Sequence, residues 1–312
     1  MPIEIKNQKI NEILKCLDPY LQGKTNAIKL SLLAFFSKGH LLIEDLPGLG
    51  KTRLAVALAR ALGLSFGRIQ CTNDLLPSDI TGLSVFNKST NSFDFHKGPV
   101  FNNIILVDEI NRATPKTQSA LLEAMAEEQV TVEGKTYRLS EPFFLIATQN
   151  PLEHFGTFPL PDNQLDRFIM RISIGYPSRE FEKDIIRGGS KRDTINSISP
   201  VLEIKETTEI QNTIRQSVLI SEKMLDYITD ILHVTRKNKF IKVGLSTRGA
   251  LALSYVAKTS AYFQDRDYII PEDIIQFLTY TVPHRLILQD QYKGIDHREL
   301  IQSILQEVKI PL

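Results

Sequence analysis

The sequence of 312 residues has few cysteines, almost no net charge and no long hydrophobic run. Cys16 and Cys71 stand far apart and match no metal-binding or redox spacing, so we expect two reduced thiols. Lys and Arg number 37 against 36 Asp and Glu, and this balance argues against a nucleic-acid partner. No apolar run reaches the ~20 residues of a membrane span. The amino-terminal residues 1–18 lack the apolar core of a signal peptide, so we expect a soluble, cytoplasmic protein.

Short apolar segments alternate with helical patterns through the first half of the chain. The segments whose length and composition are typical of buried parallel strands are 40–44, 67–71, 103–108, 142–148 and 168–174. Helical patterns dominate the second half. We therefore predict an α/β domain over residues 1–176 and a helical domain over residues 177–312.

Three positions in the second half are expected helix starts. Ser221 precedes a pattern that would bury Leu225, Ile228 and Leu232 on one face. Ser246 is a candidate N-cap for the next helix. Pro271 is expected to open one further helix that runs through Leu278.

The segment LLIEDLPGLGKT, residues 41–52, ends as a phosphate-binding loop does. Gly48 and Gly50 would let backbone N–H groups turn toward a phosphate. Lys51 could reach the β- and γ-phosphates, and the Thr52 hydroxyl could bind Mg²⁺. A glycine-rich turn with a surface lysine is the alternative.

Asp45 stands where the strict phosphate-loop pattern has glycine. Aspartate tolerates left-handed or Asx-turn geometry, in which its carboxylate accepts a nearby loop N–H. We therefore expect Asp45→Gly to change ATP affinity little.

An acidic pair, Asp108 and Glu109, follows the apolar segment IILV. Asp108 at the end of a buried strand could hold Mg²⁺, and Glu109 could deprotonate an attacking water. Asn150 ends the next expected strand, where its amide could orient that water or the γ-phosphate. Each feature alone is common in loops, but their order after the phosphate loop predicts nucleotide hydrolysis.

Two later arginines, Arg167 and Arg248, are candidates for a cation beside the γ-phosphate. Each could equally form a surface ion pair, and the residues themselves do not decide between these roles.

The order of these features resembles that of the AAA+ ATPases, and the sequences of the segments resemble the MoxR family within that group. The segments that carry the likeness are TNDLLPSDITG, GPVFNNIILVDEINRATPKTQSALLEAMAEEQVTVEG, PFFLIATQNP, GTFPLPDNQLDRF, GLSTRGALAL, YIIPEDI and PHRLIL. The likeness runs from about Gly23 to Leu288. Asp162 and Asn163 stand where Glu and Ala are usual, and Thr247 where proline is frequent.

The resemblance implies a role for each candidate residue. Asp108 and Glu109 correspond to Walker B, and Asn150 to sensor 1. Arg167 resembles the arginine finger, which acts on ATP in a neighbouring subunit, and Arg248 resembles sensor 2, which acts in its own. Thr52 and Asp108 would bind Mg²⁺. The residues expected against ATP or ADP are Gly23, Pro47, Gly48, Leu49, Gly50, Lys51, Thr52 and Arg53.

The family fold implied is a parallel five-stranded sheet in the order 5-1-4-3-2, with helices on both faces and a carboxyl-terminal helical lid. Two insertions fit the same family, a helix-2 insert at about 79–98 and a pre-sensor-1 hairpin at about 129–141. In that hairpin we expect residues 130–132 to pair with 137–139 around Gly134. It would either touch a client or pack between subunits.

The function implied is ATP-driven, chaperone-like remodelling, assembly or maturation of a partner protein or complex by a hexameric ring. A partner carrying a von Willebrand factor A domain is inherited from the family, and the client is left open. The alternatives are a nucleic-acid-dependent motor of the helicase or McrB-like type and a nucleotide-switch scaffold that does not hydrolyse ATP.

Overall fold

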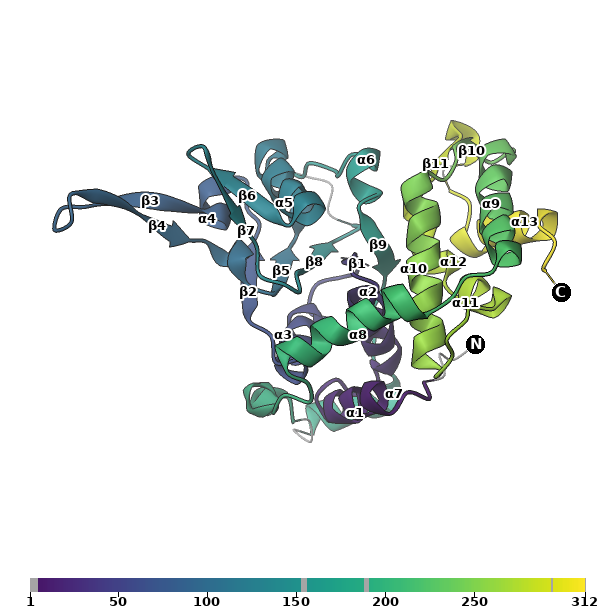
Figure 1. The fold of residues 1–312 in the computed structure, drawn as a ribbon, viewed down its shortest axis with the longest axis horizontal. Helices are drawn as coiled ribbons and strands as arrows, with labels where there is room; N and C mark the ends of the chain where they lie inside the picture. The colour runs from purple at the N-terminus through teal and green to yellow at the C-terminus, as the bar shows by residue number, and fades with distance from the viewer. Residues whose placement is uncertain (1–4, 153–155, 188–190, 293, 312) are drawn as a thin grey trace.

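A computed structural model describes residues 5–152, 156–187, 191–292 and 294–311. Its first half is built on a parallel five-stranded sheet (Figure 1). The strands are β1 (His40–Glu44), β2 (Phe66–Gln70), β5 (Ile104–Asp108), β8 (Phe144–Gln149) and β9 (Phe168–Ile172). Their spatial order is β2-β5-β8-β1-β9. When the five strands are numbered along the chain and the sheet is read from the β9 edge, this order is 5-1-4-3-2. The fold class predicted from the sequence is confirmed.

Helices cover both faces of the sheet. They are α1 (Gln8–Leu17), α2 (Thr25–Phe36), α3 (Lys51–Ala61) and α5 (Pro115–Glu127). Leu41 and Ile43 of β1 pack with α1, α2 and α3, whereas Leu42 packs with α5 on the opposite face. Because β1 is buried on both sides, its sequence is a continuous apolar run.

Two hairpins extend from the α/β core, and β3–β4 reaches furthest from the body (Figure 1). Helix α4 (Pro77–Thr81) leads into β3 (Gly82–Asn87) and β4 (Ser92–Lys97). The second hairpin pairs β6 (Gln129–Val132) with β7 (Lys135–Arg138), and Val130 lies opposite Tyr137. Phe95 of β4 stacks on Tyr137 with ring centroids 4.3 Å apart, so the two hairpins support each other.

Helices dominate the second half of the chain. Its elements are α7 (Arg179–Ile186), η4 (Lys191–Ser197), α8 (Ile204–Ser217), α9 (Glu222–Lys237), β10 (Ile241–Val243), α10 (Thr247–Phe263), α11 (Pro271–Ile275), α12 (Leu278–Thr281), η5 (Pro283–Arg285), β11 (Ile287–Leu288), η6 (Asp290–Tyr292) and α13 (His297–Glu307). Ser246 caps α10, its hydroxyl accepting a hydrogen bond from the Gly249 N–H at 3.1 Å. Helices α8 and α10 of the second half share one buried cluster with α1, α2 and α3 of the first half. The division between two domains at residues 176 and 177 therefore stays a prediction.

Two expectations for these helices are wrong. Leu225 is 41% exposed, whereas Ile228 is buried as expected, together with Tyr227 and Ile231 of α9. The helix that opens at Pro271 does not run through Leu278. It is divided between α11 and α12, where the fully buried Phe277 packs into the main core.

Within the described ranges, the structure holds no helix that is both long and apolar enough to cross a membrane.

His40 makes the stability of this core depend on pH. Its Nε2–H donates to the Met125 carbonyl at 3.0 Å, and its Nδ1 accepts from the Leu145 N–H at 3.1 Å. Burial lowers the pKa of His40 from 6.5 to about 4, so the folded state keeps the ring neutral while the unfolded chain takes up a proton below pH 6.5. The stabilisation is present above that pH and is lost as the pH falls toward 4.

We therefore expect the free energy of unfolding to fall by about 2 kcal/mol between pH 7 and pH 5 through His40 alone. Urea denaturation at the two pH values measures this change. His40→Asn should reduce the pH dependence by that amount, whereas replacing the exposed His96 by Gln should leave it intact. An unchanged pH dependence in His40→Asn would contradict the assignment.

Candidate nucleotide-binding site

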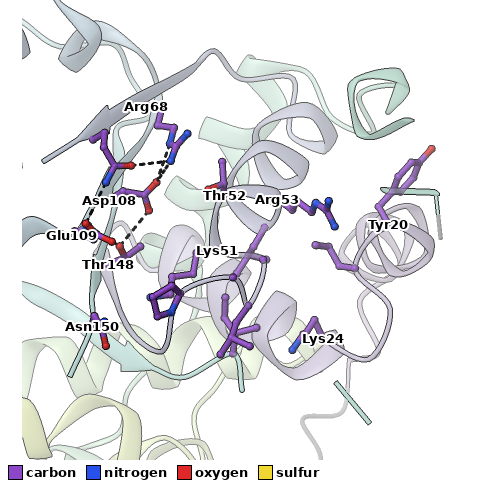
Figure 2. Close-up of a pocket in the computed structure, with 18 of the residues that line it drawn as sticks. Tyr20, Lys24, Lys51, Thr52, Arg53, Arg68, Asp108, Glu109, Thr148 and Asn150 are labelled. Atoms are coloured by element: carbon purple, nitrogen blue, oxygen red, sulfur yellow. Dashed lines mark hydrogen bonds and ion pairs between the residues drawn. The ribbon is translucent and has the colours of Figure 1, made fainter. Parts of the chain in front are cut away.

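A pocket lies at the carboxyl ends of β1, β5 and β8, where most of the candidate residues meet (Figure 2). Its lining residues are Tyr20, Leu21, Gln22, Lys24, Pro47, Gly48, Leu49, Gly50, Lys51, Thr52, Arg53, Leu54, Arg68, Gln70, Asp108, Glu109, Thr148, Asn150 and Ile174. Asp108, Glu109 and Asn150 stand on one side and Tyr20 and Lys24 on the other, with the loop between them. Seven of the eight expected nucleotide-contacting residues are in this set.

The loop between β1 and α3 has the backbone of an anion cradle. Gly48 and Gly50 have φ angles of +82° and +92°, a region that other residues seldom adopt. Helix α3 begins at Lys51, so its positive amino-terminal end faces the same space. Lys51 Nζ donates to the Asp45 carbonyl at 2.5 Å. Backbone N–H groups, a helix end and an ammonium group together suit a phosphate.

Burial lowers the pKa of the Lys51 ammonium, whereas the nearby carboxylates of Asp45, Asp108 and Glu109 act in the opposite direction. Those three acids therefore favour the charged form of Lys51 that a phosphate needs.

Asp45 does not play the part expected from the sequence. Its φ is not positive, and its carboxylate accepts no bond from the glycine loop among the interactions that the structure gives for the described residues. Instead the buried carboxylate accepts from the Ser173 hydroxyl at 3.1 Å, from the Gly175 N–H at 3.0 Å and from the Ile174 N–H. These donors lie just after β9, where the chain leaves the sheet for its second half. Asp45 therefore fastens the start of the phosphate loop to the exit of β9.

Asp108 is held by two neighbours. The guanidinium of Arg68 on β2 donates to its Oδ2 at 2.8 Å, and the Thr148 hydroxyl donates to its Oδ1 at 3.3 Å. Mg²⁺ takes oxygen ligands and usually keeps only one or two from the protein. The Asp108 carboxylate and the Thr52 hydroxyl of the same pocket fit such a site, with phosphate and water oxygens as the remaining ligands.

Glu109 is placed by its backbone and by its side chain. Its N–H donates to the Thr148 hydroxyl at 2.9 Å, and its φ of 56° is uncommon outside glycine. Arg112 Nη1 donates to its Oε2 at 3.0 Å, and Gln70 Nε2 donates to the same oxygen at 3.4 Å. The carboxylate is thus directed by partners on β2 and on η3 (Ile110–Arg112).

Of the three other expected site residues, Asn150 lies in the pocket and the two arginines lie outside it. Asn150 lines the pocket and also forms a turn, its Oδ1 accepting from the Leu152 N–H at 3.2 Å. Neither Arg167 nor Arg248 is among the described residues that line the pocket. Arg167 Nη1 donates to the Leu122 carbonyl at 3.0 Å, and Arg248 Nη1 lies 3.9 Å from Asp166 Oδ2.

Gly23 is also missing from the described lining residues, although residues 20–22 and Lys24 are among them. Gly23 itself packs on Phe181 of α7. The sequence prediction missed Tyr20, Arg68, Gln70 and the hydroxyl of Thr148, which forms hydrogen bonds to both acids of the pair. Alternation along β2, which turns Arg68 and Gln70 away from the core, is the one sequence signal for them.

Comparison with known families identifies both parts of the chain. Residues 40–170 match the ATPase family associated with various cellular activities (AAA), and residues 233–307 match the AAA lid domain.

Three proteins show how far the similarity extends. The uncharacterized protein YeaC of Bacillus subtilis is 42% identical over 97% of this chain and 95% of its own length. The chaperone MoxR1 of Mycobacterium tuberculosis is 37% identical over 93% and 79%, respectively. Protein MoxR of Methylorubrum extorquens is 26% identical over 93% and 91%.

A crystal structure of a protein from Cytophaga hutchinsonii superposes with a TM-score of 0.90 at 40% identity, covering 97% of this chain and 95% of that one.

The bonds of Asp45 lead to a prediction opposite to the one drawn from the sequence. Asp45→Gly would leave the Ile174 and Gly175 N–H groups without their acceptor, so we expect the free energy of unfolding to fall by about 2–4 kcal/mol. Because the loop loses its anchor, ATP affinity should fall about tenfold or more, which corresponds to about 1.4 kcal/mol. Urea denaturation and a nucleotide-binding titration measure the two effects.

Ser173→Ala is the matched control, since it removes one of the three donors and keeps the carboxylate. We expect its ATP affinity to change by less than about threefold. Wild-type affinity in Asp45→Gly would show that the anchor is unimportant for binding.

Proposed function

The chain belongs to the MoxR family of AAA ATPases, and from that premise we propose that it hydrolyses ATP to drive chaperone-like remodelling, assembly or maturation of a partner protein or complex. Family membership implies nucleotide binding. The observation that carries the proposal is the meeting, in one pocket, of the phosphate loop with Asp108, Glu109 and Asn150.

In the proposed reaction, the loop N–H groups and the amino-terminal end of α3 bind the phosphates of ATP. Lys51 exchanges its bond with the Asp45 carbonyl for the β- and γ-phosphates. Thr52 and Asp108 hold Mg²⁺, which when bound neutralises charge on the phosphates. Arg68 keeps the Asp108 carboxylate oriented toward the pocket.

Glu109 is the proposed general base. Its side chain is 26% exposed, so a water beside the γ-phosphate can reach it. The Thr148 hydroxyl fixes its backbone, and Arg112 and Gln70 direct its Oε2. Asn150 lies at the neighbouring strand end, where its amide can orient the same water.

Arg167 and Arg248 complete the site from outside this pocket. We propose that Arg167 acts as an arginine finger on ATP in the next subunit of a homo-oligomer, a hexameric ring as in the family. Its place apart from the described lining residues supports a role in trans. Arg248 is proposed as sensor 2 at the start of α10, and its loose contact with Asp166 leaves it able to turn toward the γ-phosphate of its own subunit.

The proposed remodelling role is supported by the similarity of this chain to other proteins. MoxR1 of Mycobacterium tuberculosis is named a chaperone and is 37% identical over most of this chain, which supports the same kind of activity here. A von Willebrand factor A domain protein is the proposed partner, and the β3–β4 and β6–β7 hairpins are the proposed contacts with clients or neighbouring subunits. The near-neutral net charge of +1 favours a protein client over nucleic acid.

Glu109→Gln tests the chemistry. The amide keeps the size of the side chain but cannot take a proton, so we expect ATP to bind within about threefold of wild type while turnover falls at least about a hundredfold. A nucleotide-binding titration and a steady-state phosphate-release assay measure the two quantities.

Glu209→Gln on the exposed side of α8 is the control and should hydrolyse ATP normally. Normal turnover in Glu109→Gln would remove Glu109 from the role of base. A wild-type protein that binds ATP and never releases phosphate would instead support a nucleotide-switch scaffold.

A further inference from the structure

Asp166 lies directly before the proposed finger and is contacted by two separate parts of the helical second half of the chain. Its Oδ1 accepts from Arg285 Nη1 of η5 at 2.6 Å. Its Oδ2 accepts from the hydroxyl of Ser246, the N-cap of α10, at 2.9 Å. The same oxygen lies 3.9 Å from Arg248 Nη1. One carboxylate next to Arg167 therefore joins both the start of α10 and η5.

The contact with Arg285 is fixed. The Arg285 side chain is only 1% exposed, and its other bonds go to the carbonyls of Asp166 at 2.8 Å and Phe168 at 2.6 Å. His284 also donates to the Phe168 carbonyl, at 2.9 Å. Burial lowers the pKa of Arg285 to about 10, so it remains a cation at neutral pH and needs the charge of Asp166 beside it. The backbone on both sides of Arg167 is thus bound to η5.

The contact with Arg248 is loose. The Arg248 side chain is 55% exposed, and its 3.9 Å separation from Asp166 is longer than a hydrogen bond. An exposed pair of this kind contributes little free energy and can be exchanged for a phosphate. Ser246, in contrast, is bonded both to Asp166 and to the Gly249 N–H of α10. A turn of Arg248 toward bound ATP would therefore change the charge around Asp166 while the start of α10 stays attached to it.

Arg167 has few restraints of its own. Its Nη1 donates to the Leu122 carbonyl of α5 at 3.0 Å, and its buried Nε has no hydrogen-bond partner within the described residues. Its position thus depends on its backbone, which Asp166 and Arg285 hold.

We propose that Asp166 is a positioning residue that ties the Arg167 finger to the start of α10, so that nucleotide bound by one subunit alters hydrolysis in the next. This inference rests on the proposed function, because it needs ATP hydrolysis in an oligomer with Arg167 acting in trans. Arg248 is the group that senses nucleotide, Asp166 is the junction, and the side chain of Arg167 is the group that moves.

Asp166→Asn tests the junction, since it keeps the shape of the side chain and removes its charge. We expect the Hill coefficient for ATP to fall from above 1 in the wild type to about 1. Turnover at saturating ATP should fall about tenfold or more because the finger is misplaced. ATP binding should change less than about threefold, as Asp166 is not among the residues that line the pocket. Asp162→Asn, exposed at the start of the short helix α6 (Asp162–Leu165) whose C-cap is Asp166, is the matched control and should behave as wild type.

Mixed oligomers separate this role from simple damage. Asp166→Asn subunits retain intact pockets, and Lys51→Ala subunits retain intact fingers, so an equal mixture should hydrolyse ATP faster than the sum of its parts. A mixture of Asp166→Asn with Arg167→Ala should show no such gain, because neither subunit offers a working finger. Gain in both mixtures, or in neither, would overturn the inference.

A second variant removes the effect of an unpaired buried charge. Asp166→Asn combined with Arg285→Gln leaves neither charge behind, so its thermal unfolding midpoint should return toward that of the wild type, while the Hill coefficient stays at about 1.

Recovery of wild-type cooperativity in this double variant would overturn the inference, as would a retained Hill coefficient in Asp166→Asn. A wild type that hydrolyses ATP without cooperativity would overturn it and leave the proposed function standing. A wild type that does not hydrolyse ATP would overturn the proposed function itself.

Discussion

The buried carboxylate of Asp45 is the interaction on which the arrangement of the site depends. It joins the exit of β1, where the phosphate loop begins, to residues 173–175 at the exit of β9. Lys24 donates from the other side to the Gly175 carbonyl, and Ile174 lines the pocket. Asp45 and Lys24 together therefore fix the loop, the segment around Lys24 and the start of the second half of the chain relative to one another. A glycine at position 45 could make none of the three bonds of the Asp45 carboxylate.

Charge balance explains how the rest of the pocket is held ready. Asp108 and Glu109 are close in space, and two adjacent carboxylates repel each other unless cations or hydrogen-bond donors face them. Arg68 faces the first and Arg112 the second, while the Thr148 hydroxyl bridges the Asp108 carboxylate and the Glu109 backbone. Each carboxylate thus has a cation and a hydrogen-bond donor near it, and Lys51 lies in the same pocket.

The strands and the phosphate loop could be predicted from the sequence because their signals are local. Buried parallel strands have continuous apolar runs, and their shared polarity brings Asp108, Glu109 and Asn150 to one edge of the sheet. The bonds of Asp45 could not be predicted, since they join residues 128–130 positions apart. The division of the helix after Pro271 depends in the same way on packing, here of Phe277 in the core. Placing Arg167 and Arg248 required the fold, because Arg167 contacts Leu122 of α5 and Arg248 lies near Asp166, which is 82 positions away in the sequence.

We propose that the complete ATPase site is shared between subunits, with Lys51 on one side and Arg167 on the other. Mixing two inactive variants, Lys51→Ala and Arg167→Ala, tests it most directly, because a mixed oligomer contains interfaces where an intact pocket meets an intact finger. We expect ATP hydrolysis to reappear in the mixture although neither variant hydrolyses ATP alone. No recovery in the mixture, together with full activity of Arg167→Ala by itself, would contradict it.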